Sequence, residues 1–421
     1  MISELPQGWL KQRIGEIAEV VGGGTPSTRD PSNFGGNIPW ITPKDLSKHH
    51  ERRIFQGERN LTKKGLTSSS VKLLPKDSVI LSSRAPIGYV AIAGTPLATN
   101  QGCRNFVLKD NCSPEYIYYV LKTMTKILKS HASGTTFDEI SGSSLKHIGV
   151  VLPPLPEQKK IASILSTLDD KIELNHQMNR TLEEMAQAIF KSWFVDFEPF
   201  QNGEFEYNNE LQKEIPKGWS VGTVADLCKR ITNGGTPRRM ESRFWNGGTF
   251  SWFKTGELTD GVLLDSEEKI THEGLKNSSC HLLPINTVIV ALYASPTVGR
   301  LGLLKVPATT NQACSALETK DEIGYAYVFH VLLSNREHLN NIAVGSAQQN
   351  ISQAIIKNLK TIIPPTSIVK KFHRLVEPLY DQMTNNEIES YKLAKIRDVL
   401  LPKLLSGEIR VNAKEDAEVS T

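Results

Sequence analysis

Two glycine-rich stretches are the first places in this chain where chemistry can be sought. Residues 21–27 read VGGGTPS and residues 233–238 read NGGTPR, and a glycine-rich turn followed by a hydroxyl residue can cradle a phosphate. A Walker-type loop also needs a lysine after its glycines to reach the phosphates. Here Thr25 is followed by Pro26, which has no amide hydrogen to donate. We therefore expect no nucleotide site in either stretch.

Other catalytic signatures are missing from the sequence. It contains no HExxH, no CxxC pair and no GxSxG. It also has neither an NPPY- or DPPY-like tetrapeptide nor the FxGxG of an adenine methyltransferase. Acidic residues at 265–268 are similar to a nuclease cluster, but the first half lacks them and a solvated charged loop explains them better. We predict a non-catalytic chain with no metal site and no cofactor of its own.

Side chains suited to reading DNA, by contrast, occur at matched places in both halves. Tandem amides stand at 100–101 and 311–312, each before a predicted strand. A side-chain amide can bond adenine bidentately, as arginine does guanine, although the same amides could instead cap loops and strand ends. A tryptophan closely followed by a lysine also occurs twice, at Trp40 and Trp252. An aromatic residue in a strand usually packs inward, which is the alternative for both.

Between these matched places the two halves diverge. SSRAPIG at 82–88 faces LYASPTVG at 292–299, and KHHERR at 48–53 faces DGVLLD at 260–265. A duplicated scaffold with different loops predicts two modules that read two different sequences. The residues that we predict to contact DNA are Trp40, Lys44, Arg84, Asn100, Gln101, Arg104, Thr135, Thr136, Lys254, Tyr293, Ser295, Asn311, Gln312 and Gln348.

An internal repeat decides the architecture. GGTP at 23–26 returns at 234–237, LATNQG at 97–102 faces ATTNQA at 308–313, and the prolines at 153–154 fall on those at 364–365. One offset of 211 positions therefore relates nearly the whole chain to itself. A period of this length is too long for a stacked solenoid and predicts two homologous halves. Such halves usually pack about a pseudo-twofold axis.

Each half begins with a mixed domain. Runs at 77–83, 88–94 and 103–108 are bounded by glycine and proline and predict strands. Residues 114–132 predict a helix with Pro114 in its first turn, and residues 322–339 predict its counterpart. This order of elements predicts an α+β, strand-rich domain in each half.

Each half ends in a long helix with a sustained apolar seam. Between positions 161 and 193, and again between 372 and 404, apolar residues recur at alternating steps of four and three. That spacing predicts two long helices, each with a coiled-coil seam. The predicted interface residues are Ile161, Leu165, Leu168, Ile172, Asn175, Leu182, Ile189, Trp193, Phe372, Val376, Leu379, Met383, Asn386, Leu393, Leu400 and Leu404.

A polar residue interrupts both seams at the same point. Asn175 and Asn386 are separated by the 211-residue offset. They could be tolerated polar spots, or their amides could meet near the middle of the pair and disfavour slipped alignments.

Composition is that of an ordinary globular protein. Of the 421 residues, 39% are hydrophobic and 22% are charged, and a net charge of +4 is compatible with nucleic acid without being diagnostic. The five cysteines form no CxxC pair, which favours reduced thiols in a cytoplasmic protein. We see neither a signal peptide nor an apolar run long enough to span a membrane.

Taken together, the repeat, the helices and several local strings resemble the specificity subunits of type I restriction-modification systems. The resemblance covers the chain almost end to end. It is carried by PWITPKDL (39–46), SSRAPIG (82–88), ATNQG (98–102), the stretch 134–172, NRTLEEMAQAIFKSWFVDF (179–197) and KIRDVLLPKLLSGEI (395–409). One departure is IIPPTSIVKKF in the second half, where the first has PPLPEQKKI. This departure predicts that the second junction contacts its partner differently.

The resemblance implies a specific architecture and role. It implies a target recognition domain at 1–152, a central helix at 153–198, a linker at 199–214, a second target recognition domain at 215–363, a distal helix at 364–406 and a tail at 407–421. Each domain would read one half of a bipartite, asymmetric double-stranded DNA site. The two helices would pair as an antiparallel coiled coil, a spacer that sets the gap.

The resemblance also implies partners. The helices would dock two modification subunits that use S-adenosylmethionine to methylate adenine, and restriction subunits that use ATP and Mg²⁺ would join the complex. Two alternatives stay open. The chain could be a stand-alone DNA-binding or scaffold protein with the same duplicated fold, or a nuclease or methyltransferase in its own right, for which the motifs are missing.

Overall fold

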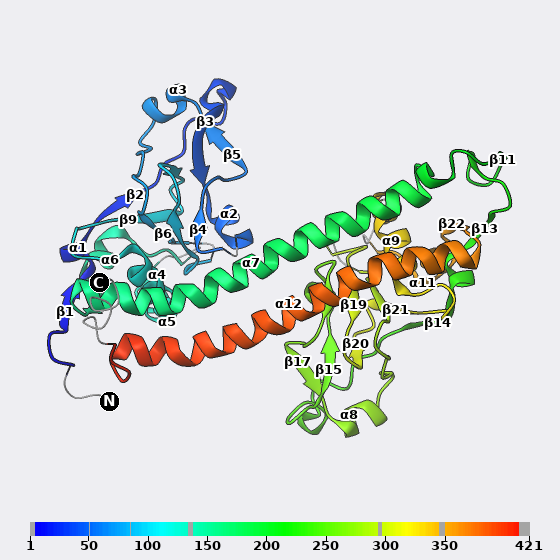
Figure 1. Ribbon diagram of the computed structural model, residues 1–421. Helices are drawn as coiled ribbons and strands as arrows, with labels where there is room; N and C mark the ends of the chain where they lie inside the picture. Colours follow the sequence, from blue (N-terminus) through cyan, green and yellow to red (C-terminus); the bar gives the residue numbers. More distant parts are fainter. Residues whose placement is uncertain are drawn as a thin grey trace, which may run out of the picture. The chain divides into compact units, whose positions relative to one another are not determined.

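The two long helices, α7 (Leu155–Phe194) and α12 (Thr366–Ser406), are the longest elements of the chain (Figure 1). The computed structural model describes residues 5–49, 51–84, 86–133, 138–293, 297–344 and 350–411. The chain divides into unit 1, with Met1–Leu174 and Ser390–Thr421, and unit 2, with Asn175–Glu389. Each unit therefore contains one repeat of the strand-rich domain together with a stretch of both long helices.

Head 1, the described part of residues 5–152, is built on a five-stranded sheet. Its strand order is β2 (Ala18–Gly22), β9 (Cys103–Leu108), β6 (Val79–Ser82), β7 (Val90–Ala93) and β4 (Arg53–Ile54). Within this sheet the β4–β7 pair is parallel and the other three pairs are antiparallel. Two smaller sheets complete the head, one of β5 (Arg59–Leu61), β3 (Phe34–Ile41) and β8 (Ala98–Thr99), the other of β1 (Leu10–Arg13) and β10 (Gly149–Leu152).

Short helices connect these strands. They are α1 (Ile14–Ile17), α2 (Pro43–Lys48), α3 (Lys63–Thr67), α4 (Pro114–Thr123), α5 (Thr125–Ser130) and α6 (Gly142–His147), with the 3-10 turn η1 (Pro31–Asn33). Ser113 caps α4, because its hydroxyl accepts a hydrogen bond from the Tyr116 amide, and Pro114 occupies the first turn as expected.

Head 2, residues 213–363, repeats this topology. Its five-stranded sheet runs β14 (Cys228–Asn233), β21 (Cys314–Thr319), β18 (Val288–Ala291), β19 (Leu301–Leu304) and β16 (Val262–Leu263), and again only the last pair is parallel. The smaller sheets are β17 (Glu268–Ile270), β15 (Phe250–Phe253) and β20 (Ala308–Thr310), and β13 (Ser220–Thr223) with β22 (Lys360–Ile363). Equal strand orders confirm the duplicated α+β fold.

The remaining elements of unit 2 lie between and after these strands. A hairpin of β11 (Phe205–Asn208) and β12 (Lys213–Pro216) follows α7. The α-helices of the head are α8 (His272–Lys276), α9 (Tyr325–Ser334), α10 (Arg336–Val344) and α11 (Gln353–Asn358). The 3-10 turns are η2 (Glu198–Phe200), η3 (Val224–Leu227), η4 (Ser242–Phe244) and η5 (Thr255–Glu257).

The central strands are apolar on both faces because both faces are covered. In β6, Val79 and Leu81 face a core shared with α4, while Ile80 faces a second core on the other side of the sheet. All four residues of β6 are buried. A strand buried on both faces reads as a continuous apolar run, which is why this strand was predictable from its sequence.

The predicted helix at 114–132 is in fact two helices, and so is its counterpart. In head 1 the break falls at Met124, between α4 and α5. In head 2 it falls at Asn335, whose side-chain amide donates to the Val331 carbonyl at 2.8 Å. A side chain that donates a hydrogen bond to a helix carbonyl competes with the backbone amide that would otherwise bond it. The spacing of apolar residues carries no information about such a bond, so the break was not predicted.

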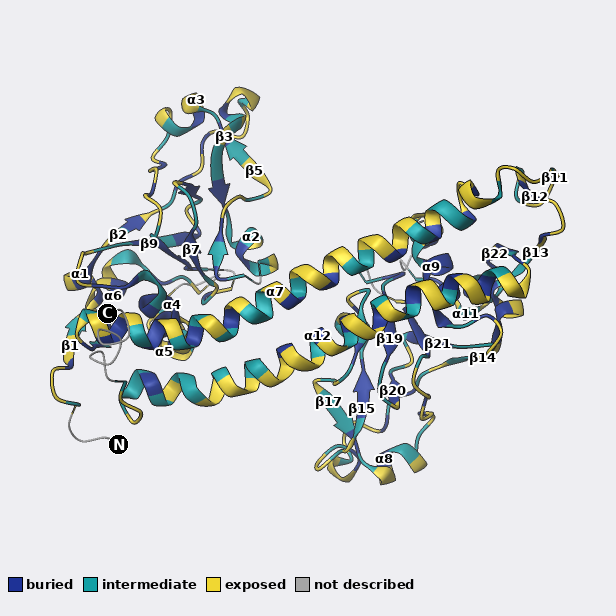
Figure 2. Cartoon of the chain, in the orientation of Figure 1, coloured by how far each residue is buried: buried dark blue, intermediate teal, exposed yellow. Residues whose placement is uncertain are grey.

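In unit 2, α7 and α12 lie side by side and run antiparallel (Figure 1). None of the predicted seam positions in either helix is exposed, and the exposed residues lie on the opposite side of each helix (Figure 2). The ends of the seams do more than pair the helices. Phe372 and Val376 belong to the core of head 2, and Ile161, Leu165 and Leu404 belong to that of head 1.

A buried polar layer crosses the helix pair in unit 2. The Asn175 amide donates to the Asn386 carbonyl at 3.3 Å and to Glu389 at 2.9 Å. The Asn386 amide donates to Asn179 Oδ1 at 2.8 Å, and the Asn179 amide donates to Glu387 at 2.8 Å. The predicted meeting of the Asn175 and Asn386 side chains is therefore wrong in detail, because the amide of Asn386 bonds Asn179. These specific bonds favour the register interpretation over a tolerated polar spot.

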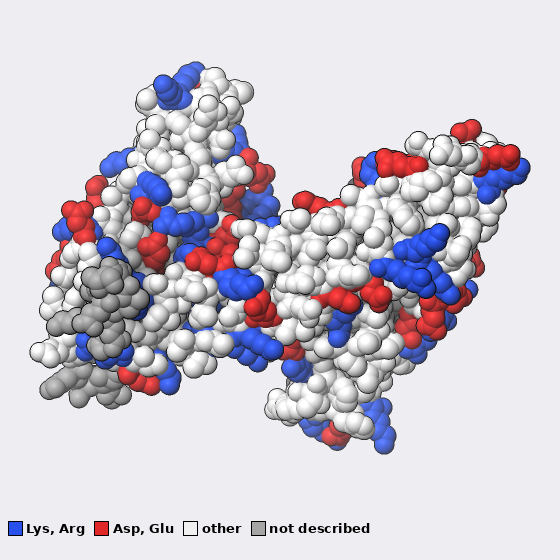
Figure 3. All heavy atoms as spheres, in the orientation of Figure 1, with Lys and Arg blue, Asp and Glu red and all other residues white. Residues whose placement is uncertain are grey.

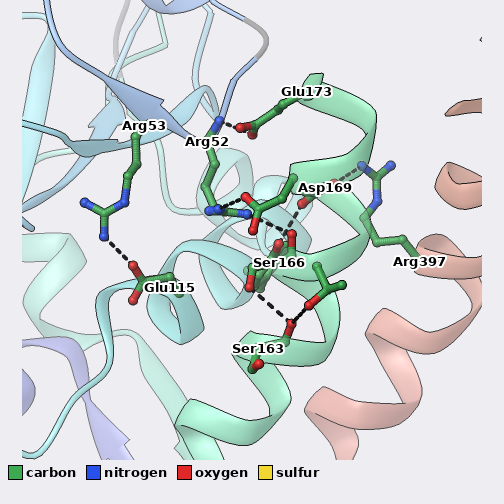
Figure 4. A network of polar contacts seen from close by, with 11 residues as sticks. Arg52, Arg53, Glu115, Ser163, Ser166, Asp169, Glu173 and Arg397 are labelled. Atoms are coloured by element: carbon green, nitrogen blue, oxygen red, sulfur yellow. Dashed lines mark hydrogen bonds and ion pairs between the residues drawn. The ribbon is translucent and has the colours of Figure 1, made fainter. Parts of the chain in front are cut away.

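Head 1 is fixed to the helices of unit 1 by a charged node (Figure 4). Asp169 on α7 is buried and accepts from the Tyr119 hydroxyl at 2.6 Å and from Arg397 of α12 at 2.6 Å. Arg52 of the head forms an ion pair with Asp170, and its backbone amide donates to Glu173 at 2.7 Å. One carboxylate thus joins the head to both helices.

The equivalent node of unit 2 is aromatic. Tyr119, Asp169 and Arg397 correspond to His330, Tyr380 and Ala186 at the 211-residue offset. The Tyr380 hydroxyl lies 3.2 Å from His330 Nε2, and the ring of Phe190 stacks on His330. Burial lowers the pKa of His330 to about 4, so the imidazole is neutral at neutral pH. The two heads are therefore held by different chemistry at the same place.

We predict that Asn179→Ala lowers the free energy of unfolding by about 1–3 kcal/mol, because it leaves the buried Asn386 amide without its acceptor. Urea titration of the full chain measures the change. Gln177→Ala, an exposed position on the same helix, is the matched control and should cost less than about 0.5 kcal/mol. Equal losses for the two variants would contradict the polar layer's role.

Candidate functional site

The repeated glycine stretch of head 1 crosses the loop before β9. The Gly24 amide donates to the Thr99 carbonyl at 2.9 Å, and the Thr25 hydroxyl donates to Gln101 Oε1. A Cβ atom on Gly23 would clash with the Asn100 carbonyl. Glycine is therefore required here by the close approach of two backbones rather than by a phosphate. We call residues 22–25 and 99–104, together with 83–84 and 139–140, the loop junction of head 1.

Head 2 repeats the junction bond for bond. The Gly235 amide donates to the Thr310 carbonyl at 2.9 Å, and the Thr236 hydroxyl donates to Gln312 Oε1. A Cβ atom on Gly234 would clash with the Asn311 carbonyl. Residues 233–236 and 310–315, with 292–293 and 350–351, form the loop junction of head 2. The recurring sequence strings are thus one structural unit, made twice.

The tandem amides mainly build these loops. Asn100 Oδ1 accepts from the Gly102 amide at 2.9 Å, and Asn311 Oδ1 accepts from the Ala313 amide at 3.1 Å. Both asparagines therefore cap their own turns, as the alternative interpretation held. Gln101 and Gln312 are exposed or partly exposed and use only a carbonyl oxygen in the bonds to the threonines. The side-chain NH₂ groups of both glutamines can therefore still donate hydrogen bonds to a ligand.

Trp40 was predicted to contact DNA, and its position argues against that role. Its side chain is only 5% exposed, and Nε1 donates to the Gly24 carbonyl at 3.1 Å. Trp252 does the same to the Gly235 carbonyl at 2.8 Å. A large aromatic ring in a strand gains most by burial, so both tryptophans hold the glycine loops from inside.

The predicted lysines lie at the surface in ion pairs. Lys44 pairs with Glu58 at 2.8 Å, with both side chains more than half exposed. Lys254 pairs with Glu267 at 2.9 Å and Glu268 at 3.1 Å, and hydrogen bonds to these two carboxylates raise its pKa. Such pairs contribute little to stability, so either lysine can be released to a phosphate.

Tyr293, two residues after the end of β18 in head 2, is exposed. The other predicted contacts of that kind, Thr135, Thr136, Ser295 and Gln348, lie outside the described residues. The structure nevertheless fixes the segments beside them. The Ile140 amide donates to the Ser83 carbonyl at 3.0 Å, and the Ile351 amide donates to the Leu292 carbonyl at 2.9 Å. Equivalent loops of both heads therefore meet at equivalent places.

Two arginines and one glutamate give the junction of head 1 its charge. Arg104 donates to Glu139 Oε1 at 2.8 Å and to the carbonyls of Gln101 and Cys103 at 2.9 and 3.1 Å. Arg84 lies 3.6 Å from Glu139 Oε2. Glu139 was not among the predicted residues. Only its place opposite Arg84 in a β-bridge reveals it, and that is a tertiary contact.

The corresponding junction of head 2 is uncharged among its described residues. Ser315 stands where head 1 has Arg104, and Asn350 stands where it has Glu139. Gln353 replaces Gly142, over which Arg104 lies, and the Gln353 amide donates to Asn233 at 2.9 Å. The frame is conserved between the heads while its side-chain chemistry changes from ionic to amide and hydroxyl.

One further basic residue was missed by sequence reasoning. Arg239 follows the second glycine stretch, stacks on Trp245 and Trp252, and forms an ion pair with Glu268. Its guanidinium centre lies 3.9 Å from the Trp245 ring centroid. Tandem arginines directly after a repeated landmark were the available signal.

Charge is spread over the surface rather than gathered into one basic field. On the face drawn in Figure 3, basic and acidic side chains are interspersed over each unit, in keeping with the net charge of +4. Within the described ranges, no three His, Cys, Asp or Glu side chains are placed to hold a metal ion. All five cysteines are free thiols. No helix in the described part of the chain combines the length and the apolar character that a membrane crossing needs.

The model of one protein family matches the chain twice. This family, described as the type I restriction modification DNA specificity domain, matches residues 6–184 and 216–394. The MjaIX specificity subunit of a type I restriction enzyme from Methanocaldococcus jannaschii is 40% identical over 416 residues, which cover 97% of this chain and 95% of that protein. The HindI specificity subunit from Haemophilus influenzae is 27% identical and covers 95% of this chain and 99% of that protein.

A solved structure shares the fold. The type I restriction-modification S subunit from M. genitalium superimposes with a TM-score of 0.58 at 17% identity, over 95% of this chain and 97% of that one.

We predict that Gly23→Ala destabilises the protein by about 1–3 kcal/mol, because the new methyl group meets the Asn100 carbonyl. Gly22→Ala is the matched control, since a Cβ at Gly22 has no described atom within 4 Å. Thermal unfolding of the two variants beside the parent chain measures the difference. A Gly23→Ala variant as stable as Gly22→Ala would show that the two loops do not cross as closely as described.

Proposed function

The chain belongs to the family of type I restriction-modification DNA specificity subunits, and from that membership we propose how it works. Head 1 reads one half of a bipartite, asymmetric double-stranded DNA site and head 2 reads the other half. The paired helices dock two adenine methyltransferase subunits, and through them restriction subunits. The chain itself performs no chemistry and acts in the cytoplasm.

One observation carries this proposal: two loop junctions with the same backbone frame and different side chains. The crossing of the glycine stretch with the amide loop is repeated in both heads. What differs is the group at each equivalent position, such as Arg104 against Ser315. Recognition of two unlike half-sites needs this combination, because a constant frame presents a variable set of donors and acceptors to base edges.

The chemistry of the system then lies in the partners. S-adenosylmethionine belongs to the methyltransferase subunits, and ATP and Mg²⁺ belong to the restriction subunits. Interspersed surface charge and ion-paired lysines support a further part of the proposal, that the lone chain grips DNA weakly and that partners supply much of the phosphate contact. The alternative, a stand-alone DNA-binding or scaffold protein, is separated from this one by the first experiment below.

The full chain, tagged and purified from its native cells, should bring with it two copies of an adenine methyltransferase for each copy of this chain. When this complex is expressed in cells without such methylation, single-molecule sequencing should show methylated adenines within one bipartite, asymmetric motif. In low-salt gel shifts the lone chain should bind weakly, with a steep loss of affinity as salt rises. Purification of the chain without a methyltransferase would favour the stand-alone alternative. Tight, specific binding of DNA by the lone chain would contradict the proposal that partner subunits supply much of the phosphate contact.

Helix length should set the gap between half-sites. Insertions of seven residues after Leu174 in α7 and after Glu389 in α12 leave every contact inside each unit intact, and one heptad preserves the phase of both seams. Each insertion adds about 10 Å of helix, so the gap in the methylated motif should lengthen by about three base pairs. Inserting only in α7 is the control and should abolish methylation, because the seams no longer match. An unchanged gap in the double insertion would refute the spacer role.

A further inference from the structure

The two arginines of the head 1 junction differ in how much of their bonding capacity is in use. A guanidinium has five N–H donors. That of Arg104 is bound on three sides, by Glu139 and by the carbonyls of Gln101 and Cys103, and its side chain is 18% exposed. These bonds fasten the loop before β9 to residue 139. Arg104 is thus committed to the architecture of the junction.

Arg84 is placed differently. Within the described part of the chain, the ionic partner of its guanidinium is Glu139, at 3.6 Å, and its side chain is 35% exposed. Its backbone forms a β-bridge with Glu139, which anchors the base of the side chain. The preceding Ser83 is buried, and its amide and hydroxyl both bond the Gly102 carbonyl. The backbone of Arg84 is therefore fixed, while one edge of its guanidinium forms no hydrogen bond within the described part of the chain.

Glu139 contacts both guanidiniums, Arg104 by a hydrogen bond and Arg84 by a longer ion pair at 3.6 Å. Oε1 accepts from Arg104 and Oε2 faces Arg84. A carboxylate beside an arginine offsets its charge, which weakens a purely electrostatic grip on phosphate. The same carboxylate faces one nitrogen of the Arg84 guanidinium, which leaves the other edge open to a directional, bidentate partner. In DNA, the base edge with two acceptors in that geometry is guanine, through O6 and N7.

On this basis, and resting on the function proposed above, we propose that Arg84 determines the specificity of head 1 by reading a guanine in its half-site. Arg104 and Glu139 are positioning residues. Glu139 pairs with one edge of the Arg84 guanidinium, and Arg104 holds Glu139 and the loop before β9 in place. Head 2 has no arginine at the equivalent described positions, where Tyr293, Ser315 and Asn350 stand in place of Arg84, Arg104 and Glu139. The half-site read by head 1 therefore contains a guanine contacted by arginine at this place in the junction, and the half-site read by head 2 has no equivalent contact.

The test is motif mapping with the methyltransferase complex. Arg84→Ala and Arg84→Lys should each relax one position of one half-site, occupied by guanine in the parent motif, with discrimination falling about 10-fold or more. Lysine keeps the charge but cannot make the bidentate contact. Lys76→Ala is the control, an exposed cation in the same head before β6, at the opposite end of the strand from Arg84. It should leave the motif unchanged.

Glu139→Gln tests the positioning role. It should loosen the same guanine position without altering any other, and Glu139→Asp should restore part of the discrimination. Unfolding curves of the variants separate this effect from lost stability, because reduced folding lowers methylation at all sites equally and leaves the motif intact.

Three outcomes would overturn the assignment. One is a parent motif without guanine in either half, and another is an unchanged motif in Arg84→Ala. The third is a uniform loss of methylation in Arg84→Ala that Arg84→Lys restores, which would make Arg84 a phosphate contact. A parent complex that yields no bipartite motif at all would instead refute the proposed function, and this assignment with it.

Discussion

Completion of each head's hydrophobic core by the long helices is the constraint on which the rest of the structure depends. In unit 1, Ile161 and Leu165 of α7 and Leu404 of α12 are buried in the core of head 1. In unit 2, Phe190 and Phe194 of α7 pack with Phe372 of α12 and Tyr327 of head 2, with ring centroids 4.9–5.9 Å apart. Each core thus takes side chains from the end of one helix and the beginning of the other. A recognition head cannot bury its apolar surface without both helices, so head and helix pair fold as one body in each unit.

Polar groups then decide which of many apolar arrangements is adopted. Apolar seams tolerate slipped alignments, because one leucine packs much like another. The layer of Asn175, Asn179 and Asn386 does not, since a shift would leave buried amides without partners. At the head anchors the chain uses two solutions, the Asp169 carboxylate in unit 1 and the neutral His330–Tyr380 pair in unit 2. Duplication preserved the geometry of the anchor while its chemistry changed, as it did in the loop junctions.

The loop junctions combine a repeated backbone frame with side chains that differ between the heads. Glycine at 23 and 234 lets two backbones cross, the tryptophans hold the crossing from within, and asparagines cap the turns. The hydrogen-bonding groups of these residues are already used within the backbone frame. What remains for a ligand are side chains whose donors are not fully used, of which Arg84 in head 1 is the clearest case. Residues that recur in both halves therefore belong mostly to the scaffold, and the specificity proposed above rests on residues that differ.

The sequence by itself determined the duplication, the strands at 77–83, 88–94 and 103–108, the two long helices and the phase of their seams. All of these follow from local periodicity and from self-similarity at one offset, which are properties of the chain in one dimension. It could not determine that the helix at 114–132 breaks at Met124, that Trp40 points inward, or that the side-chain amide of Asn386 donates to Asn179. Nor could it bring Glu139 to Arg84 and Arg104, which lie 55 and 35 positions away. Periodicity tells which face of an element is buried but not which neighbour covers it. That choice depends on packing and hydrogen bonding between distant segments, and it exists only in the tertiary structure.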